Sequence, residues 1–368
     1  MALIKSQRET LLAPLQSVSG IVERRHTLPI LSNVLLEKQG EHLTFLATDI
    51  EIQITTHTQG AIGDENGAVT VGAKKLQDIL RSLPEGTEIS LSLDEKRLLI
   101  RAGKSRFSLQ TLPADDFPRM ALSEGESHSF SISQRAFRQL IGKTQYAMAT
   151  QDVRYYLNGM MLLVDGKELT SVATDGHRLA FSRIEINKEL PRQEMILPRK
   201  TVLELNRLLS DNEEPLNISM TNSQICFAFD NVTLVSKLID GKFPDFERVI
   251  PNSLRHQIRL NRLQLIQAMQ RAAILTIEKL RGVRVILADN TLKIIAANAE
   301  QEEAIEEIEV DYNDESIDAG FNVSYLLDML NNVQTDEVLW SFNDAASSSL
   351  LTVPENTQFK YVVMPMRI

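Results

Sequence analysis

The chain has 368 residues, of which 43% are hydrophobic and 24% charged, and its formal net charge is −10. This composition predicts a folded protein of two or three domains and excludes a disordered chain, while the acidic average argues against a simple basic nucleic-acid binder. A single cysteine, Cys226, excludes a disulfide scaffold and multi-cysteine metal sites. Without a bilayer-length apolar run or a signal-peptide pattern, we expect a soluble, cytoplasmic protein.

Three similar segments indicate an internal repeat. They are Leu-Ala-Thr-Asp at 46–49, Val-Ala-Thr-Asp at 172–175 and Ile-Ala-Ala-Asn at 295–298. Helix and strand patterns recur at the same offsets. We therefore expect three domains, at 1–125, 126–252 and 253–368; a single mixed domain is the alternative.

Each repeat begins with a predicted amphipathic helix, for which Ser6, Ser133 and Asn261 are the expected N-caps. A second helix follows later, with apolar residues at i, i+3 and i+7. Its three copies are Leu76, Ile79, Leu83; Val202, Leu205, Leu209; and Leu326, Met329, Val333.

Short apolar or alternating runs between these helices predict strands. They lie at 43–54, 88–100, 160–164, 224–235 and 283–295, with turns expected at 84–86, 165–166 and 240–241. The predicted fold class is α+β, in which each of three repeated domains packs two helices on antiparallel sheets.

The charge is unevenly distributed along the chain. Five of the six helix-like segments are net positive, so the rest of the chain is more acidic than the average. If the helices share one surface, that surface is basic. The alternative is that Lys and Arg simply favour solvated helix faces.

Two charged blocks stand in different repeats. Residues 96–106 hold five bases and no acid, whereas residues 300–309 hold six acids and no base. Opposite charges in the first and third repeats suit head-to-tail association into a ring, although two unrelated solvated runs are the alternative. The expected subunit-interface residues are Arg97, Lys104, Arg106, Phe107, Leu109, Ile274, Leu275, Glu300, Glu302, Glu303 and Glu306.

Helix width sets how many chains such a ring needs. The six predicted helices of one chain, each about 10 Å wide, would enclose a lumen of roughly 9 Å, which is too narrow for duplex DNA. Helices from two chains would enclose roughly 28 Å, wide enough for a duplex and a water layer. A two-chain ring lined by basic helices could thread DNA without contacting its bases.

The sequence resembles the bacterial sliding clamps, the beta subunits of DNA polymerase III, along nearly its whole length. The most specific stretches are Thr-Leu-Pro-Ile-Leu at 27–31, the segments 151–159 and 172–180, Gly-Phe-Asn-Val-Ser-Tyr at 320–325, and the C-terminal 361–368. Phe246-Glu247 departs from the Tyr-Arg frequent in relatives, and Ile368 replaces a frequent Leu.

The resemblance implies a homodimeric ring of six domains that encircles duplex DNA, is opened by a separate clamp loader, and tethers polymerases and repair proteins. It implies no catalysis, cofactor or metal. The implied partner-peptide pocket consists of Leu157, Thr174, Gly176, His177, Arg178, Leu179, Pro244, Arg248, Val249, Ser348, Val362, Met364, Pro365, Met366 and Arg367, with arginine charge at its rim. The DNA-contact candidates are Arg24, Arg25, Gln151, Tyr155, Tyr156, Arg199 and Lys200.

Other interpretations of these residues stay open. Residues 362–366 could be a buried last strand, and Tyr155 and Tyr156 could pack in the core instead of stacking on bases. His177 beside Asp175 could act as a base, but no metal- or catalysis-like spacing accompanies it. The alternative function is a repeat-built protein-binding scaffold that does not encircle DNA.

Overall fold

The computed structural model of the chain describes residues 3–23, 28–60, 63, 66–121, 127–277, 280–354 and 356–367. The chain forms two compact units: Met1–Phe137 with Leu203–Leu238, and Arg138–Val202 with Ile239–Ile368. No helix in the described ranges is long and apolar enough to cross a membrane.

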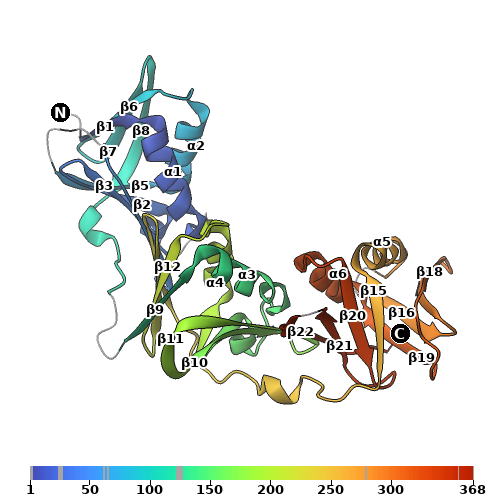
Figure 1. Cartoon of the computed structure of the whole chain (residues 1–368). Coiled ribbons are helices and arrows are strands. Elements are labelled where there is room, and N and C mark those ends of the chain that lie inside the picture. The colour runs from blue at the N-terminus through green and yellow to red at the C-terminus, as the bar shows by residue number, and fades with distance from the viewer. Residues whose placement is uncertain are drawn as a thin grey trace. The chain divides into compact units, whose positions relative to one another are not determined.

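The first unit is built on a twelve-stranded antiparallel sheet, against which α1 (Arg8–Val18) and α2 (Ala73–Ser82) pack side by side (Figure 1). In sheet order its strands are β1 (Ile4–Gln7), β6 (Glu88–Asp94), β7 (Arg97–Ala102), β8 (Ser105–Leu112), β5 (Gly67–Gly72), β2 (Asn33–Gln39), β3 (His42–Thr48), β4 (Ile52–Thr58), β14 (Val232–Lys237), β13 (Gln224–Phe229), β12 (Pro215–Met220) and β9 (His128–Ser133).

The second unit has a six-stranded and a four-stranded antiparallel sheet, and α5 (Arg262–Ala273) packs beside α6 (Val323–Asn332) (Figure 1). The six strands are β10 (Gly159–Thr174), β11 (Arg178–Pro198), β22 (Asn356–Val363), β21 (Ser349–Val353), β20 (Glu337–Phe342) and β15 (His256–Asn261). The four are β18 (Glu303–Glu309), β17 (Thr291–Ala297), β16 (Gly282–Ala288) and β19 (Ile317–Asn322).

The remaining helices are short. The α-helices are α3 (Gln134–Gly142) and α4 (Arg199–Leu208). The 3₁₀ turns are η1 (Ser19–Ile21), η2 (Pro29–Ser32), η3 (Ala114–Asp116), η4 (Gln145–Ala147), η5 (Tyr155–Leu157) and η6 (Phe246–Arg248). The predicted α+β class with antiparallel sheets and two helices per repeat is confirmed.

Two of the three predicted N-caps are confirmed. The side chains of Ser133 and Asn261 accept backbone N–H bonds from Ala136 and Gln264. Ser6 is wrong as a cap, because α1 begins only at Arg8. The Ser6 hydroxyl instead donates to the Gly60 carbonyl at 3.4 Å.

One predicted turn was wrong, and one predicted helix stripe is incomplete. In α2, Leu80 is fully buried and Ile79 only half-buried, because i and i+4 share the core-facing side of this helix as well as i and i+3. Residues 165–166 form no chain reversal: they lie within β10, Gly166 has φ +59°, and the register shifts on both sides of it because β11 contributes the extra residues opposite.

Strand pairing joins each repeat to the next. β4 pairs with β14 from Ile52 to Thr56, and β11 pairs with β22 from Arg178 to Ser182. The strands of the middle repeat are therefore divided between the two compact units. The three-domain boundaries at 125 and 252 stay a prediction.

Candidate functional site

A tight turn joins β10 to β11 and contains the Thr-Asp-Gly-His-Arg sequence. The Thr174 hydroxyl donates to the Arg178 carbonyl at 2.6 Å, and Asp175 Oδ1 accepts the backbone N–H groups of His177 and Arg178. Gly176 has φ +90°, a left-handed conformation that favours glycine. The turn is thus fixed by its own side chains, and His177 is exposed.

The C-terminal segment lies against this turn. β22 pairs with β11, and beyond the strand the Met364 N–H donates to the His177 carbonyl at 2.9 Å. Two residues later, the Met366 N–H donates to the Gly320 carbonyl at 2.8 Å. Residues from the second and third repeats therefore meet at one place, as the proposed pocket requires.

An apolar cluster lies below the turn and the C-terminal segment. It includes Leu179, Val362, Phe243 and Phe246, with half-buried Val249 packed against it. The side chain of Met364 is 42% exposed. An exposed, flexible methionine beside a half-buried valine provides adaptable apolar surface for a ligand.

The expected pocket residues divide by burial. Leu157, Leu179 and Val362 are fully buried, so they can support a ligand surface only from beneath, and Leu157 is not a member of the cluster. Thr174 is also buried. Those at the surface or half-buried are Gly176, His177, Pro244, Arg248, Val249, Ser348, Met364, Pro365, Met366 and Arg367.

Arg178 does not supply charge at a rim, contrary to expectation. Its side chain is only 9% exposed, and its guanidinium pairs with Asp175 at 3.1 Å and Asp328 of α6 at 2.6 Å. It also donates to the Tyr146 carbonyl and lies over the Tyr325 ring. Burial opposes its charge, but Tyr361 and the two carboxylates raise the pKa of Arg178 overall.

This network predicts a cost for removing Asp328. Asp328→Ala leaves the buried Arg178 guanidinium short of one charged partner, so we expect the free energy of unfolding to fall by about 2 kcal/mol. Urea unfolding of the variant measures this loss. Asp336→Ala, an exposed acid just beyond the same helix, is the control; equal stability of the two variants would contradict the buried role of Arg178.

The DNA-contact candidates are only partly described. Arg24 and Arg25 lie outside the described residues. Gln151 is exposed and Tyr155 is 58% exposed, whereas half-buried Tyr156 packs against the apolar cluster, as in the core-packing alternative. Arg199 and Lys200 are half-buried at the start of α4, where the Arg199 guanidinium donates to the Met148 carbonyl.

An ion pair between Asp152 and Arg154 lies just before Tyr155 and Tyr156 in the chain. Hydrogen bonds from the side chain and backbone of Arg154 lower the pKa of Asp152 to about 2, so the carboxylate stays ionised at neutral pH. The same guanidinium donates to the Asp175 carbonyl at 3.3 Å. Arg154, the residue before the exposed Tyr155, is thereby tied to the turn that carries His177.

The basic block of the first repeat lies on β7 and β8. Residues 105–110 of β8 pair with β7, but β8 meets β5 only at Thr111 and Leu112. Among the described strands, this stretch therefore has a neighbour on one side only. Exposed Arg106 and half-buried Phe107 and Leu109 lie along it, close to exposed Arg97 and Lys104. An open strand edge can pair with another chain.

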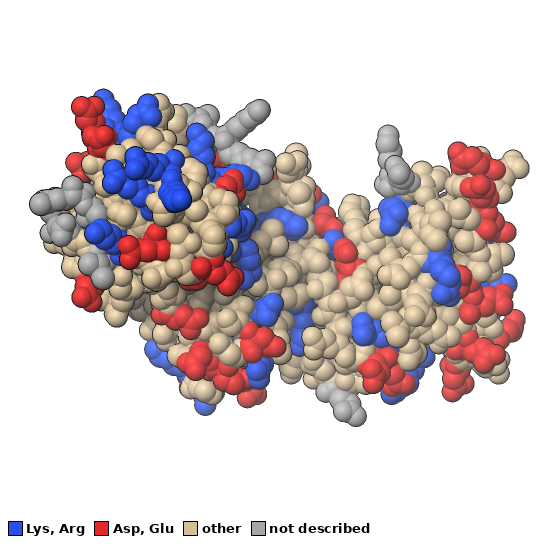
Figure 2. Space-filling model, turned by 90° about the horizontal axis from the view of Figure 1, so that it is seen from above, with Lys and Arg blue, Asp and Glu red and all other residues tan. Residues whose placement is uncertain are grey.

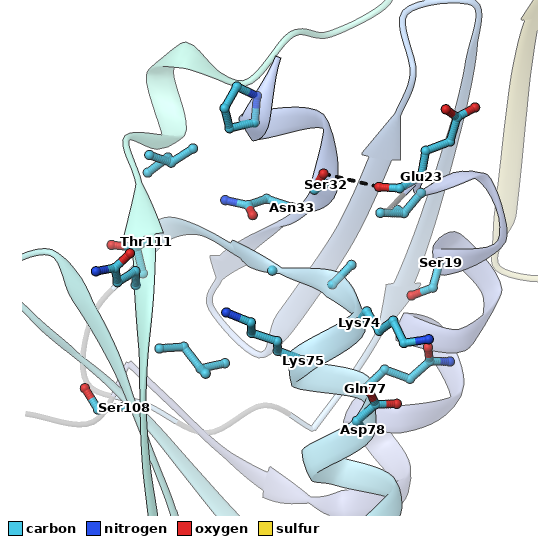
Figure 3. Close-up of a pocket in the computed structure, with 17 residues that line it drawn as sticks. Ser19, Glu23, Ser32, Asn33, Lys74, Lys75, Gln77, Asp78, Ser108 and Thr111 are labelled. Carbon is cyan, nitrogen blue, oxygen red and sulfur yellow. Dashed lines mark hydrogen bonds between the residues drawn. The ribbon is translucent and has the colours of Figure 1, made fainter. Parts of the chain in front are cut away.

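A pocket of about 800 Å³ opens where β8 separates from β5 and α2. Its lining includes Ser108–Leu112 and four charged residues, Lys74, Lys75, Glu23 and Asp78. Figure 3 shows Lys75 pointing from α2 into the space toward β8, while Lys74 lies toward Ser19. Both lysines were missed from the sequence, because only the fold brings α2 beside β8.

The acidic block of the third repeat runs into β18, which among the described strands pairs with β17 alone and so also ends a sheet. Figure 2 shows acidic side chains gathered over this part of the second unit, and basic side chains gathered on the first unit. Glu300, Glu302 and Glu303 are exposed, but Glu306 pairs with Arg271, which lowers its pKa.

Apolar side chains accompany these acids. Ile274 is exposed and Leu275 half-buried after α5, and exposed Ile277 and Leu280 lie nearby in the chain. Ile305, 51% exposed on β18, was also missed, because the surrounding glutamates made the whole strand look polar. The edge thus offers apolar contacts as well as charge.

Three family models match the chain: the N-terminal, central and C-terminal domains of the DNA polymerase III beta subunit, over residues 3–121, 131–245 and 247–367. A beta sliding clamp from Pseudomonas aeruginosa is 48% identical over 365 residues, covering 98% of this chain and 99% of the relative. One from Escherichia coli strain K12 is 45% identical over 362 residues, with the same coverage. A crystal structure of the Pseudomonas aeruginosa sliding clamp bound to griselimycin has a TM-score of 0.94 at 47% identity and covers 100% of both chains.

Proposed function

The chain belongs to the DNA polymerase III beta subunit family, and we propose that two copies join through their β8 and β18 edges into a ring around duplex DNA. It is a non-catalytic processivity factor that tethers DNA polymerase and depends on a clamp loader to reach DNA. The match of all three domains along nearly the whole chain carries this assignment. We place its activity in the cytoplasm.

The proposed subunit interface rests on complementary edges. β8 carries Arg106 beside the pocket that Lys74 and Lys75 line together with Glu23 and Asp78, and β18 carries exposed Glu303 and Ile305. A second copy's β18 laid along β8 would add backbone hydrogen bonds, bring glutamates to the lysines and cover Ile305. The same contacts occur again at the second interface, because two head-to-tail contacts close a dimeric ring.

The proposed partner-peptide pocket is formed by the exposed and half-buried residues Gly176, His177, Pro244, Arg248, Val249, Ser348, Met364, Pro365, Met366 and Arg367. Its support is the junction of turn, apolar cluster and C-terminal segment, together with the griselimycin-bound relative. Exposed methionine and half-buried valine suit a short apolar ligand, and Arg248 and Arg367 add charge outside them.

Topological binding predicts a strong dependence on DNA ends. After a clamp loader places the protein on a nicked circular plasmid, we expect long retention; linearising the plasmid should speed release at least tenfold, because the ring slides off. Fluorescently labelled protein retained on bead-bound plasmid before and after restriction cleavage measures both rates. Uncut plasmid treated with heat-inactivated enzyme is the control.

Equal release from circular and linear DNA would contradict encirclement and favour a protein-binding scaffold. The phosphate contacts themselves are expected to be weak and sequence-independent, since a basic lining meets only the backbone.

A further inference from the structure

A second, smaller cavity of about 230 Å³ lies in the first unit. It is formed by the turn between β3 and β4, the segment after η3, and the facing ends of β13 and β14. The lining residues are Thr48, Ile50, Pro118, Arg119, Met120, Ala121, Gln224 and Lys237. None of them belongs to the pocket, DNA-contact or interface residues described above.

The turn in this cavity repeats four side-chain hydrogen bonds of the turn in the partner-peptide pocket. The Thr48 hydroxyl donates to the Ile52 carbonyl and accepts the Ile50 N–H, as Thr174 does with Arg178 and Gly176. Asp49 Oδ1 accepts the N–H groups two and three residues on, as Asp175 does.

The neighbouring strand and linker also correspond. The Lys237 N–H donates to the Glu51 carbonyl at 2.9 Å, as the Met364 N–H does to His177. Phe117 before Pro118 belongs to a core cluster with Leu46; likewise Phe243, before Pro244, shares a cluster with Val172, the residue equivalent to Leu46.

The linings can therefore be matched position by position. Gln224 pairs with Lys237, while Ser349 pairs with Val363, which places Ser348 opposite Met364. Five cavity residues, Thr48, Ile50, Pro118, Gln224 and Lys237, occupy the positions of the pocket residues Thr174, Gly176, Pro244, Ser348 and Met364. The cavity is the internal-repeat counterpart of the pocket.

Ile50 is the lining residue that differs most from its counterpart in the partner-peptide pocket, and its backbone conformation is a separate argument for a binding role. It has φ +70°, a left-handed conformation costly for a β-branched side chain, where its counterpart is Gly176. Its side chain is nevertheless 42% exposed and lines the cavity. A strained backbone that presents an apolar side chain to a cavity indicates a binding role at that position.

Charge identifies the kind of ligand. The charged lining residues are both basic, Arg119 and Lys237, and their pairs with Glu37 and Glu51 are exposed, so a ligand carboxylate can compete for them. We propose that this cavity is a second, weaker docking site for a short acidic–apolar peptide segment of a clamp partner. The proposal rests on the proposed function, since the pocket defines what the cavity is a counterpart of.

The size of the cavity sets the length of the docked segment. Pockets for drug-sized ligands measure about 300–1,000 Å³, so this cavity takes only one or two side chains. The apolar side chain would contact Ile50 and Met120, and the acid would reach Lys237. A partner with two suitable segments could then use both junctions of one chain, gaining avidity without a stronger single contact.

Methyl NMR of the full-length dimer tests the proposal. With ¹³C-methyl Ile and Met, the peptide acetyl-Glu-Leu-Glu-Leu-amide should shift the Ile50 and Met120 signals at millimolar concentration, while Met364 reports the pocket. Lys237→Glu should weaken the Ile50 and Met120 response at least tenfold and leave Met364 unchanged. Lys167→Glu, the same charge change at an exposed site, is the control.

Ile50→Gly removes the apolar side chain that the docked segment would contact and should weaken the Met120 response without unfolding the turn, since glycine accepts the left-handed conformation. A shift of the Met364 signal alone would contradict the second site and leave the proposed function in place. If Lys237→Glu does not weaken the response at Ile50 and Met120, the proposed preference for an acidic segment is wrong. If no signal moves, the second site is rejected, and griselimycin titration of the pocket decides the proposed function separately.

Discussion

Reversing two charges beside the free edge of β8 should break the ring. Lys104→Glu combined with Arg106→Glu places acids opposite the acidic β18 edge of the second copy, and like-charge juxtaposition at an interface costs several kcal/mol. We expect the dimer dissociation constant to rise about 100-fold by this argument. Sedimentation equilibrium at about 0.1 M salt measures it, because higher salt screens exposed charges.

A charge swap makes this test specific to the proposed pairing. Adding Glu300→Lys and Glu303→Lys to the same chain should recover at least tenfold of the lost affinity. Lys5→Glu, on the opposite edge strand β1, is the control and should leave the dimer intact. A dimer as tight as the parent in the doubly reversed chain would exclude β8 from the interface.

Local patterns predicted the helices and strands because their determinants are close in sequence. The stripe Val202, Leu205, Leu209 is buried as expected, and the caps at Ser133 and Asn261 act within three residues. Where two faces compete, as at Ile79 in α2, periodicity alone does not select the core-facing residue. Tertiary packing decides it.

The site was less predictable because its determinants are distant. Arg178 was expected at a rim, as an arginine is usually exposed, but its partner Asp328 lies 150 residues away. Ile305 was missed because only the pairing of strands places it at a sheet edge, and Lys75 was missed because only the fold brings α2 beside β8. The position of the proposed pocket at the C-terminal segment came from the resemblance to a family, since the apolar run 362–366 by itself predicts a buried strand.

Removing residues 364–368 should abolish partner-peptide binding while the dimer survives. The deletion takes away Met364 and its bond to His177, and Met366 with its bond to Gly320, but leaves the pairing of β22 with β11. Griselimycin affinity, measured by calorimetric titration, should fall at least 100-fold. The dimer should persist, because the β8 and β18 edges contain none of these residues.

A single substitution distinguishes the loss of a ligand contact from the loss of the folded C-terminal segment. Met364→Ser keeps the C-terminal backbone and removes only the exposed apolar side chain, so griselimycin affinity should fall about tenfold, in keeping with the one or two kcal/mol that burying part of such a side chain contributes. Leu263→Ser, at an apolar residue on α5 that is somewhat more exposed than Met364, is the control and should bind normally. Unchanged affinity in both the deletion and Met364→Ser would mean that the ligand binds elsewhere, because no contact with the C-terminal segment would then contribute to it.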